Sequence, residues 1–214
     1  MSVPATADLL RRVAAYYSAK VVDHGATARG VDWNSPESQE LRFQQLERLF
    51  EDAEPFTIND YGCGYGAFAV FLRRRGRRAP YCGFDISKEM LTAAGRVLAD
   101  VEDWRLVDAR DDMPKADYTI ASGIFNVKLD AADGAWREHA LTTLDRLDAL
   151  STRGFSFNML TSYSDPERMR PDLYYANPGE LFDHCKRRFS RNVALLHDYG
   201  LYEFTLLVRK DVGA

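Results

Sequence analysis

The sequence contains no long apolar run and no segment of the export-signal kind. Among its 214 residues, no stretch approaches the roughly 18 consecutive apolar residues that a membrane-spanning helix needs. The segment 1–20 alternates charged and apolar side chains and has no apolar signal-peptide core. These absences lead us to expect a cytoplasmic protein without a membrane partner.

Cysteine is also scarce. The three cysteines, Cys63, Cys82 and Cys185, are odd in number and do not cluster in the sequence. A disulfide framework needs pairs of cysteines, and a zinc site needs closely spaced ligands. We therefore predict neither a disulfide framework nor a bound metal.

An excess of positive charge is missing as well. The 28 lysines and arginines are outnumbered by 32 aspartates and glutamates, which leaves a net charge of −4. Nucleic-acid-binding proteins typically carry a basic patch on a basic domain. The arginines between positions 73 and 78 end a predicted helix, where cations complement the helix dipole and stay hydrated. We do not expect a nucleic-acid partner.

What the chain does have is a glycine-rich turn. The run DYGCGYG at 60–66 follows an apolar stretch at 55–59 and precedes a predicted helix. Glycines at alternate positions allow a tight turn and a close approach of the backbone to a ligand, which a Cβ would block. The carboxylate of Asp60 repels a pyrophosphate group and attracts an ammonium group. The turn therefore predicts a site for a cationic ligand.

Two further strand-like runs also end in a carboxylate. The run at 81–84 is followed by Asp85, and the run at 104–107 is followed by Asp108. In an open α/β sheet, ligands bind outside the carboxyl ends of the strands. We therefore expect Asp60, Asp85 and Asp108 to line one crevice, with Asp85 placed to accept hydrogen bonds from ribose hydroxyls.

Together these features resemble the class I S-adenosylmethionine-dependent methyltransferases, specifically over residues 56–125. The resemblance implies that S-adenosylmethionine is the cofactor. It further implies that Asp60 and the glycine turn hold the methionine end, that residues after the second and third strands hold the adenosine, and that 122–125 lie beneath the sulfonium. The implied cofactor contacts are Asp60, Tyr61, Gly62, Cys63, Gly64, Asp85, Ile86, Met90, Asp108, Ala109, Ser122, Gly123 and Phe125.

Strands and helices alternate along the chain, which predicts an α/β fold with a doubly wound, mostly parallel, seven-stranded sheet. The link at 198–201 is too short to cross a sheet, so the last strand is expected to be antiparallel. Residues 1–54 are predicted to form amino-terminal lid helices, with Ser35 and Pro36 beginning the second helix. Residues 55–214 would form the cofactor-binding domain as one unit.

Four residues outside the sheet edge are candidates for contacts with the substrate or the lid: His24, Trp33, Arg42 and Tyr163. His24 and Trp33 fall in the loop between the first two helices. Arg42 lies on the second helix, where either the cofactor carboxylate or solvent is a suitable partner. Tyr163 lies in a long loop after the fifth strand, at the edge where an acceptor would bind.

The sequence favours methyl transfer to a small molecule, since no added recognition domain or basic surface is evident. Three alternatives remain open: methyl transfer to RNA or protein, a non-catalytic S-adenosylmethionine-binding module, and an NAD-dependent oxidoreductase. Gly62, Gly64 and Ala67 fit the looser dinucleotide pattern G-x-G-x-x-A. Asp60 disfavours that last alternative, because it faces the place that a pyrophosphate would occupy.

Overall fold

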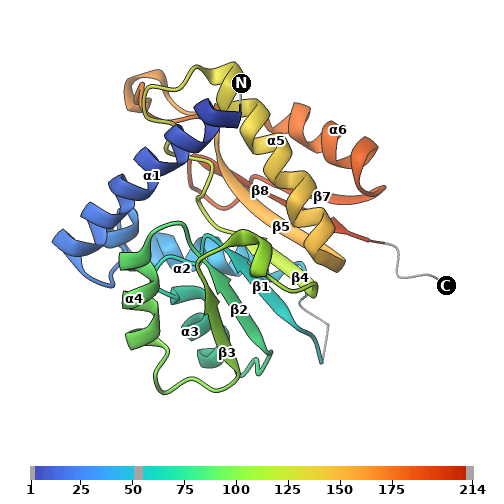
Figure 1. The fold of residues 1–214 in the computed structure, drawn as a ribbon. Helices are drawn as coiled ribbons and strands as arrows, with labels where there is room; N and C mark the ends of the chain where they lie inside the picture. Colours follow the sequence, from blue (N-terminus) through green and yellow to red (C-terminus); the bar gives the residue numbers. More distant parts are fainter. Residues whose placement is uncertain (1–2, 51–54, 211–214) are drawn as a thin grey trace.

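One mixed β-sheet runs through the part of the chain that the structure, a computed structural model, describes: residues 3–50 and 55–210. Its strands pair in the order β3-β2-β1-β4-β5-β8-β7, and the short β6 pairs with β5 beside this path (Figure 1). The strands are β1 (Ile58–Tyr61), β2 (Tyr81–Phe84), β3 (Trp104–Val107), β4 (Ala116–Ala121), β5 (Ser151–Thr161), β6 (Tyr175–Ala176), β7 (Asn192–Leu196) and β8 (Glu203–Arg209).

The first five strands are parallel, so their carboxyl ends share one edge of the sheet. β8 runs antiparallel to both β5 and β7, which confirms the reversed strand predicted from the short link at 198–201. The seven predicted strands are all present. The two-residue β6 was not predicted, because so short a strand leaves no period in the sequence.

Helices cover both faces of the sheet, as a doubly wound fold requires. Phe43, Leu46 and Phe68 belong to the core on one face, and Leu144 and Leu181 belong to the core on the other. Adjacent residues of β8 alternate between these cores, which is the period of a strand buried on both sides. The helices are α1 (Val3–His24), α2 (Pro36–Glu47), α3 (Ala67–Arg74), α4 (Lys88–Val97), α5 (Asp133–Leu150) and α6 (Pro178–Arg188), with the 3-10 turns η1 (Arg29–Val31), η2 (Arg110–Asp112) and η3 (Pro166–Arg168).

The two amino-terminal helices take different positions. α1, dark blue in Figure 1, runs from the start of α5 to α4 and crosses the carboxyl edge of the sheet. α2 instead packs on β5 and β8 and contributes to the core. As predicted, Ser35 caps α2 by accepting a hydrogen bond from Ser38, and Pro36 occupies the first turn. Only α1 therefore lies where a lid would lie.

The predicted boundary between residues 54 and 55 falls at the edge of 51–54, which lie outside the described residues. In the described part of the chain, no helix combines the length and the apolar character needed to cross a membrane.

Candidate functional site

The glycine turn connects β1 to α3 and is fixed by hydrogen bonds to β2. Gly62, Gly64 and Gly66 have φ values of 85°, 53° and 80°, a left-handed conformation that favours glycine. The amides of Gly62 and Cys63 both donate to the Phe84 carbonyl, at 2.7 and 2.8 Å. The turn is therefore held rigidly at the carboxyl edge of the sheet.

Asp60 is a buried carboxylate directly before this turn, with only 2% of its surface exposed. The Tyr81 hydroxyl donates to its Oδ2 atom at 2.7 Å. Burial raises the pKa of Asp60 to about 7, and the neighbouring negative charge of Asp85 adds to this effect. No ion pair with Asp60 forms among the described residues, so no cationic side chain there compensates the charge that this carboxyl gains when it ionises.

Asp85, at the end of β2, is held in one orientation by two backbone amides. Gly64 donates to its Oδ2 atom at 2.9 Å, and Ser87 donates to its Oδ1 atom at 2.8 Å. Burial raises the pKa of this carboxyl to about 6, against the effect of those hydrogen bonds. Because each carboxylate oxygen has two lone pairs, both oxygens retain an acceptor site for a ligand.

A small cavity of about 30 Å³ lies against the glycine turn. The Ser122 side-chain oxygen, after β4, is buried and finds no hydrogen-bond partner among the described residues. An unpartnered buried hydroxyl is costly unless a ligand or a water completes it. The cavity is lined by Val31, Trp33, Gln39, Phe43, Asp60, Gly62, Cys63, Gly64, Tyr65, Ala67, Phe68 and Ser122.

Comparison with known proteins identifies the family. Residues 58–147 match the family model described as a methyltransferase domain. The chain is 57% identical over 168 residues to Rv1506c, a protein of Mycobacterium tuberculosis (strain H37Rv) that is named as a methyltransferase. The match covers 76% of this chain and 98% of that protein. The chain belongs to the class I S-adenosylmethionine-dependent methyltransferases.

Solved structures of this methyltransferase fold agree. The magnesium protoporphyrin IX methyltransferase of Synechocystis PCC 6803 with bound S-adenosylhomocysteine has a TM-score of 0.67 at 16% identity, covering 94% of this chain and 99% of its own. Human N-acetylserotonin methyltransferase in complex with S-adenosylmethionine has a TM-score of 0.57 at 18% identity, covering 92% and 66%. The family's cofactor is S-adenosylmethionine, which excludes the NAD-dependent oxidoreductase considered above.

In this methyltransferase, some of the predicted cofactor-binding residues lie together at the cavity. Asp60, Gly62, Cys63, Gly64 and Ser122 line it, and so does the lid candidate Trp33. The second part of the set lies around the same edge: Asp85 and Gly123 are buried beside the cavity residues, Met90 is buried, Ile86 is 39% exposed, and Asp108 and Ala109 are exposed after β3.

Two predicted cofactor contacts have side chains that point elsewhere. The ring of Phe125 is fully buried and packs on Phe157, and its carbonyl accepts a hydrogen bond from Trp136 at 2.7 Å. Tyr61 packs on Phe84, on the face of β1 opposite to Asp60, because neighbouring strand residues alternate. Both residues were predicted from their place in the chain, and the alternation along β1 that turns the Tyr61 ring away was not considered.

The candidates for substrate or lid contacts other than Trp33 do not line the cavity. Arg42 is in neither place that the sequence allowed: it is buried and paired with Glu203, so it contacts neither solvent nor the position of a cofactor carboxylate. His24 is exposed at the end of α1. Tyr163 is 73% exposed, and its ring lies 5.9 Å from that of His197.

Six cavity residues were not predicted as site residues: Val31, Gln39, Phe43, Tyr65, Ala67 and Phe68. Gln39 and Phe43 are one turn apart on α2, and the Tyr65 hydroxyl donates to Gln39 at 2.8 Å. The spacing of Gln39 and Phe43 places them on one face of a helix, which was a usable signal. The position of Val31 depends on how η1 packs against Gly64, which no local pattern specifies.

Proposed function

We propose that this protein transfers a methyl group from S-adenosylmethionine to a small-molecule acceptor, using the cavity beside Asp60 as part of the cofactor site. The observation that carries this proposal is the pair of buried carboxylates, Asp60 and Asp85, at the ends of adjacent parallel strands. A ligand with a cationic ammonium group and ribose hydroxyls matches both carboxylates. The ammonium group would supply the opposite charge to Asp60, and the hydroxyls would donate to the acceptor sites of Asp85.

The residues present fit this cofactor. Asp60 would face the ammonium group, Asp85 would accept from the ribose hydroxyls, and Ser122 would complete its hydrogen bonding against the methionine part. Met90, Ile86 and the exposed Asp108-Ala109 turn would surround the adenine. When bound, the cofactor supplies an electrophilic methyl group on a sulfonium. The protein's part is to orient the acceptor in line with it and to exclude water.

The small-molecule acceptor is supported by α1. This helix crosses the carboxyl edge and contacts both α5 and α4, with Leu9 and Val13 packed near Trp136 and Ser18 bonded to Ser87. We propose that α1 acts as a lid, beneath which a compact acceptor fits better than a polymer. Two of the similar structures are named for small acceptors, magnesium protoporphyrin IX and N-acetylserotonin.

A binding experiment tests the cofactor site. S-adenosylhomocysteine at about 100 times its dissociation constant should stabilise the protein by roughly 2.7 kcal/mol, whereas NADH should not. Asp60→Asn should weaken S-adenosylhomocysteine binding by about tenfold or more, because a charge-assisted contact is lost. Asp100→Asn, at an exposed position after α4, is the matched control and should bind like the wild type. Equal affinities for all three proteins would contradict the proposed site.

The pH dependence of binding sharpens this test. Because the pKa of Asp60 is about 7 in the unliganded protein, its carboxyl must lose a proton to pair with an ammonium group. Affinity should therefore rise as pH increases toward about 7, by at most about tenfold per pH unit. Asp60→Asn should remove that rise, and an identical pH profile in the variant would assign it to another group.

The acceptor class is tested by fractionation. Cell extract separated into low-molecular-mass, RNA and protein fractions is incubated with the enzyme and S-adenosylmethionine carrying a labelled methyl group. We expect label in the low-molecular-mass fraction. Label confined to RNA or protein would overturn the small-molecule assignment and leave the cofactor site in place.

A further inference from the structure

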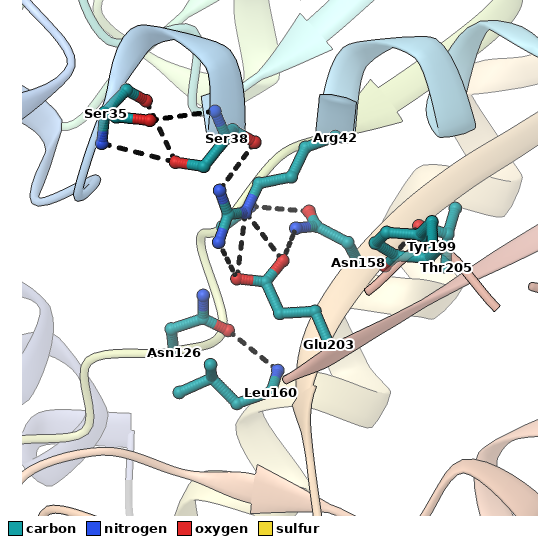
Figure 2. A network of polar contacts seen from close by, with 10 residues as sticks. Ser35, Ser38, Arg42, Asn126, Asn158, Leu160, Tyr199, Glu203 and Thr205 are labelled. Carbon is teal, nitrogen blue, oxygen red and sulfur yellow. Dashed lines mark hydrogen bonds and ion pairs between the residues drawn. The ribbon is translucent and has the colours of Figure 1, made fainter. Parts of the chain in front are cut away.

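A buried ion pair joins α2 to the start of β8. The Arg42 Nε atom donates to both carboxylate oxygens of Glu203, at 2.9 and 2.8 Å, and Nη2 donates to Oε1 at 2.6 Å (Figure 2). The side chains are only 7% and 0% exposed. The pair is thus fully enclosed and held by a bidentate geometry that fixes its orientation.

Other polar groups of the pair also form hydrogen bonds. Arg42 Nη1 donates to the Ser38 carbonyl at 2.7 Å, and Asn158 Nδ2 donates to Glu203 Oε2 at 2.5 Å. A buried ion pair contributes little net stability compared with apolar residues of the same shape. We therefore ask which neighbouring groups the ion pair holds in place.

One route leads from this pair to the backbone after β4. Asn158, fully buried on β5, uses its amide group in two directions: Nδ2 reaches Glu203, and Oδ1 accepts a hydrogen bond from the Gly123 amide at 2.9 Å. The ion pair thereby fixes the Asn158 side chain, and Asn158 fixes the Gly123 peptide.

A second route reaches the same glycine through an aromatic ring. The Arg42 guanidinium lies 3.9 Å from the centre of the Trp33 ring, a close cation–π contact. A Cβ placed on Gly123 would lie 2.4 Å from Trp33 Cζ2, so the indole rests directly on this glycine. The two routes begin at one ion pair and end at one residue.

Gly123 adjoins Ser122, and Ser122 and Trp33 both line the cavity beside Asp60. We propose that Arg42, Glu203 and Asn158 are positioning residues, which hold Trp33 against Gly123 and so set one wall of the cofactor cavity. None of these three residues lines the cavity itself. This inference rests on the proposed function, because the wall formed by Trp33 and Gly123 matters for binding only if the cavity holds the cofactor.

The test uses the full chain labelled with 5-fluorotryptophan and observed by ¹⁹F NMR. The three tryptophans give separate signals, and Trp33→Phe assigns that of Trp33. In Glu203→Gln, the Trp33 signal should shift or broaden without any ligand, while those of Trp104 and Trp136 stay in place. S-adenosylhomocysteine should bind on the order of tenfold more weakly to this variant, a size typical of indirect coupling.

The chain offers a matched control on the same helix. Glu47, also buried on α2, pairs with Arg75 of α3 at 2.6 Å and does not line the cavity. Glu47→Gln should leave the Trp33 signal in place and the affinity within about twofold of the wild type. If both variants weaken binding equally, general loosening of α2 is the cause, and the proposal is overturned.

Two further variants keep the proposal falsifiable if Glu203→Gln does not fold. Arg42→Lys retains the charge but loses the planar stack and the bidentate contact, so it should shift the Trp33 signal with a smaller loss of affinity. In a Trp33→Phe background, Glu203→Gln should have less effect on affinity than in the wild type, because part of its action passes through the indole.

The failure of this inference is distinguishable from the failure of the cofactor site. A wild-type protein that does not bind S-adenosylhomocysteine would contradict the proposed function, whatever the tryptophan signals show. A wild-type protein that binds it, together with a Glu203→Gln variant of unchanged affinity and unchanged Trp33 signal, would overturn the positioning role alone.

Discussion

The two amino-terminal helices are attached to the sheet by different kinds of contact. α2 buries Phe43, Leu46 and the Arg42–Glu203 pair against the sheet. α1 meets the rest of the protein through a small apolar cluster around Leu9, through part-buried contacts such as Lys20 with Asp32, and through exposed pairs such as Arg12 with Asp130. Exposed ion pairs of this kind contribute little to stability.

This difference separates the roles that we propose for the two helices. α2 belongs to the core and forms a wall of the cavity, so moving it would disrupt the sheet. We expect α1 to separate from the edge at a lower free energy, because Leu9 and Val13 pack in a small satellite cluster and not in a main core of the sheet. A lid needs that second kind of attachment.

The largest expected effect comes from matched core truncations in the two helices. Leu46→Ala should lower the free energy of unfolding by about 2–5 kcal/mol, because Leu46 is fully buried. Leu9→Ala, also at a buried position, should lower it by no more than about 2 kcal/mol, because local opening of α1 limits the loss. Urea unfolding followed by circular dichroism measures both, and equal losses would contradict the distinction.

Two buried carboxylates, Glu203 and Asp60, differ in whether a cationic side chain pairs with them, and this difference predicts how stability depends on pH. Glu203 is neutralised by Arg42, whereas Asp60 has a pKa raised to about 7 by burial. The native state then holds a proton on Asp60 that the unfolded state, with an ordinary pKa near 4, has lost. The free energy of unfolding should therefore fall as pH rises from about 4 to about 7, by at most about 1.4 kcal/mol per pH unit.

Urea unfolding at a series of pH values measures this fall. Asp85, whose pKa is raised to about 6, contributes in the same direction over a narrower range. Asp60→Asn should flatten the profile most, and Asp100→Asn should leave it as in the wild type. A wild-type stability that rises through this pH range would show that Asp60 is charged in the native state.

Hydrogen exchange sharpens the comparison of the helices directly. Backbone amides in α1 should exchange through local opening at a free energy at least about 2 kcal/mol below that of α2, whose amides should require global unfolding. S-adenosylhomocysteine should slow exchange in α1 more than in α2 if α1 closes over the ligand. Identical protection of both helices, measured by mass spectrometry, would remove the basis for a lid.

The smallest effect is expected at the contact between α1 and α4. Ser18 donates to Glu89 at 2.6 Å and shares a 2.8 Å hydrogen bond with Ser87. Ser18→Ala should change the free energy of unfolding by about 1 kcal/mol or less, since the contact is partly exposed, while it speeds exchange in α1. A large global loss in this variant would indicate that α1 is part of the core.

The sequence was sufficient to predict features that depend on local pattern. Ser35 caps α2 as expected, and the short link at 198–201 specified the antiparallel β7–β8 pair. The three predicted acids follow parallel strands that end at one edge of the sheet; Asp60 and Asp85 are buried there, and Asp108 is exposed after β3.

Features that depend on tertiary contacts could not be predicted. Arg42 was left between solvent and a cofactor carboxylate, because its partner Glu203 is 161 residues away. The start of the first strand was also placed too early, at 55 instead of Ile58. An apolar run shows that a strand exists, but its pairing partner decides where it begins.

The distance in sequence between Arg42 and Glu203 has a consequence for the order of folding. During synthesis, α2 emerges long before β8, the last strand of the sheet, so a nascent chain carries an Arg42 without its carboxylate. The wall formed by Trp33 and Gly123 can be completed only after the final hairpin inserts β8 beside β5. Assembly of the cavity beside Asp60 is thereby coupled to the arrival of the carboxy-terminal hairpin, and a chain interrupted before β8 would lack this wall.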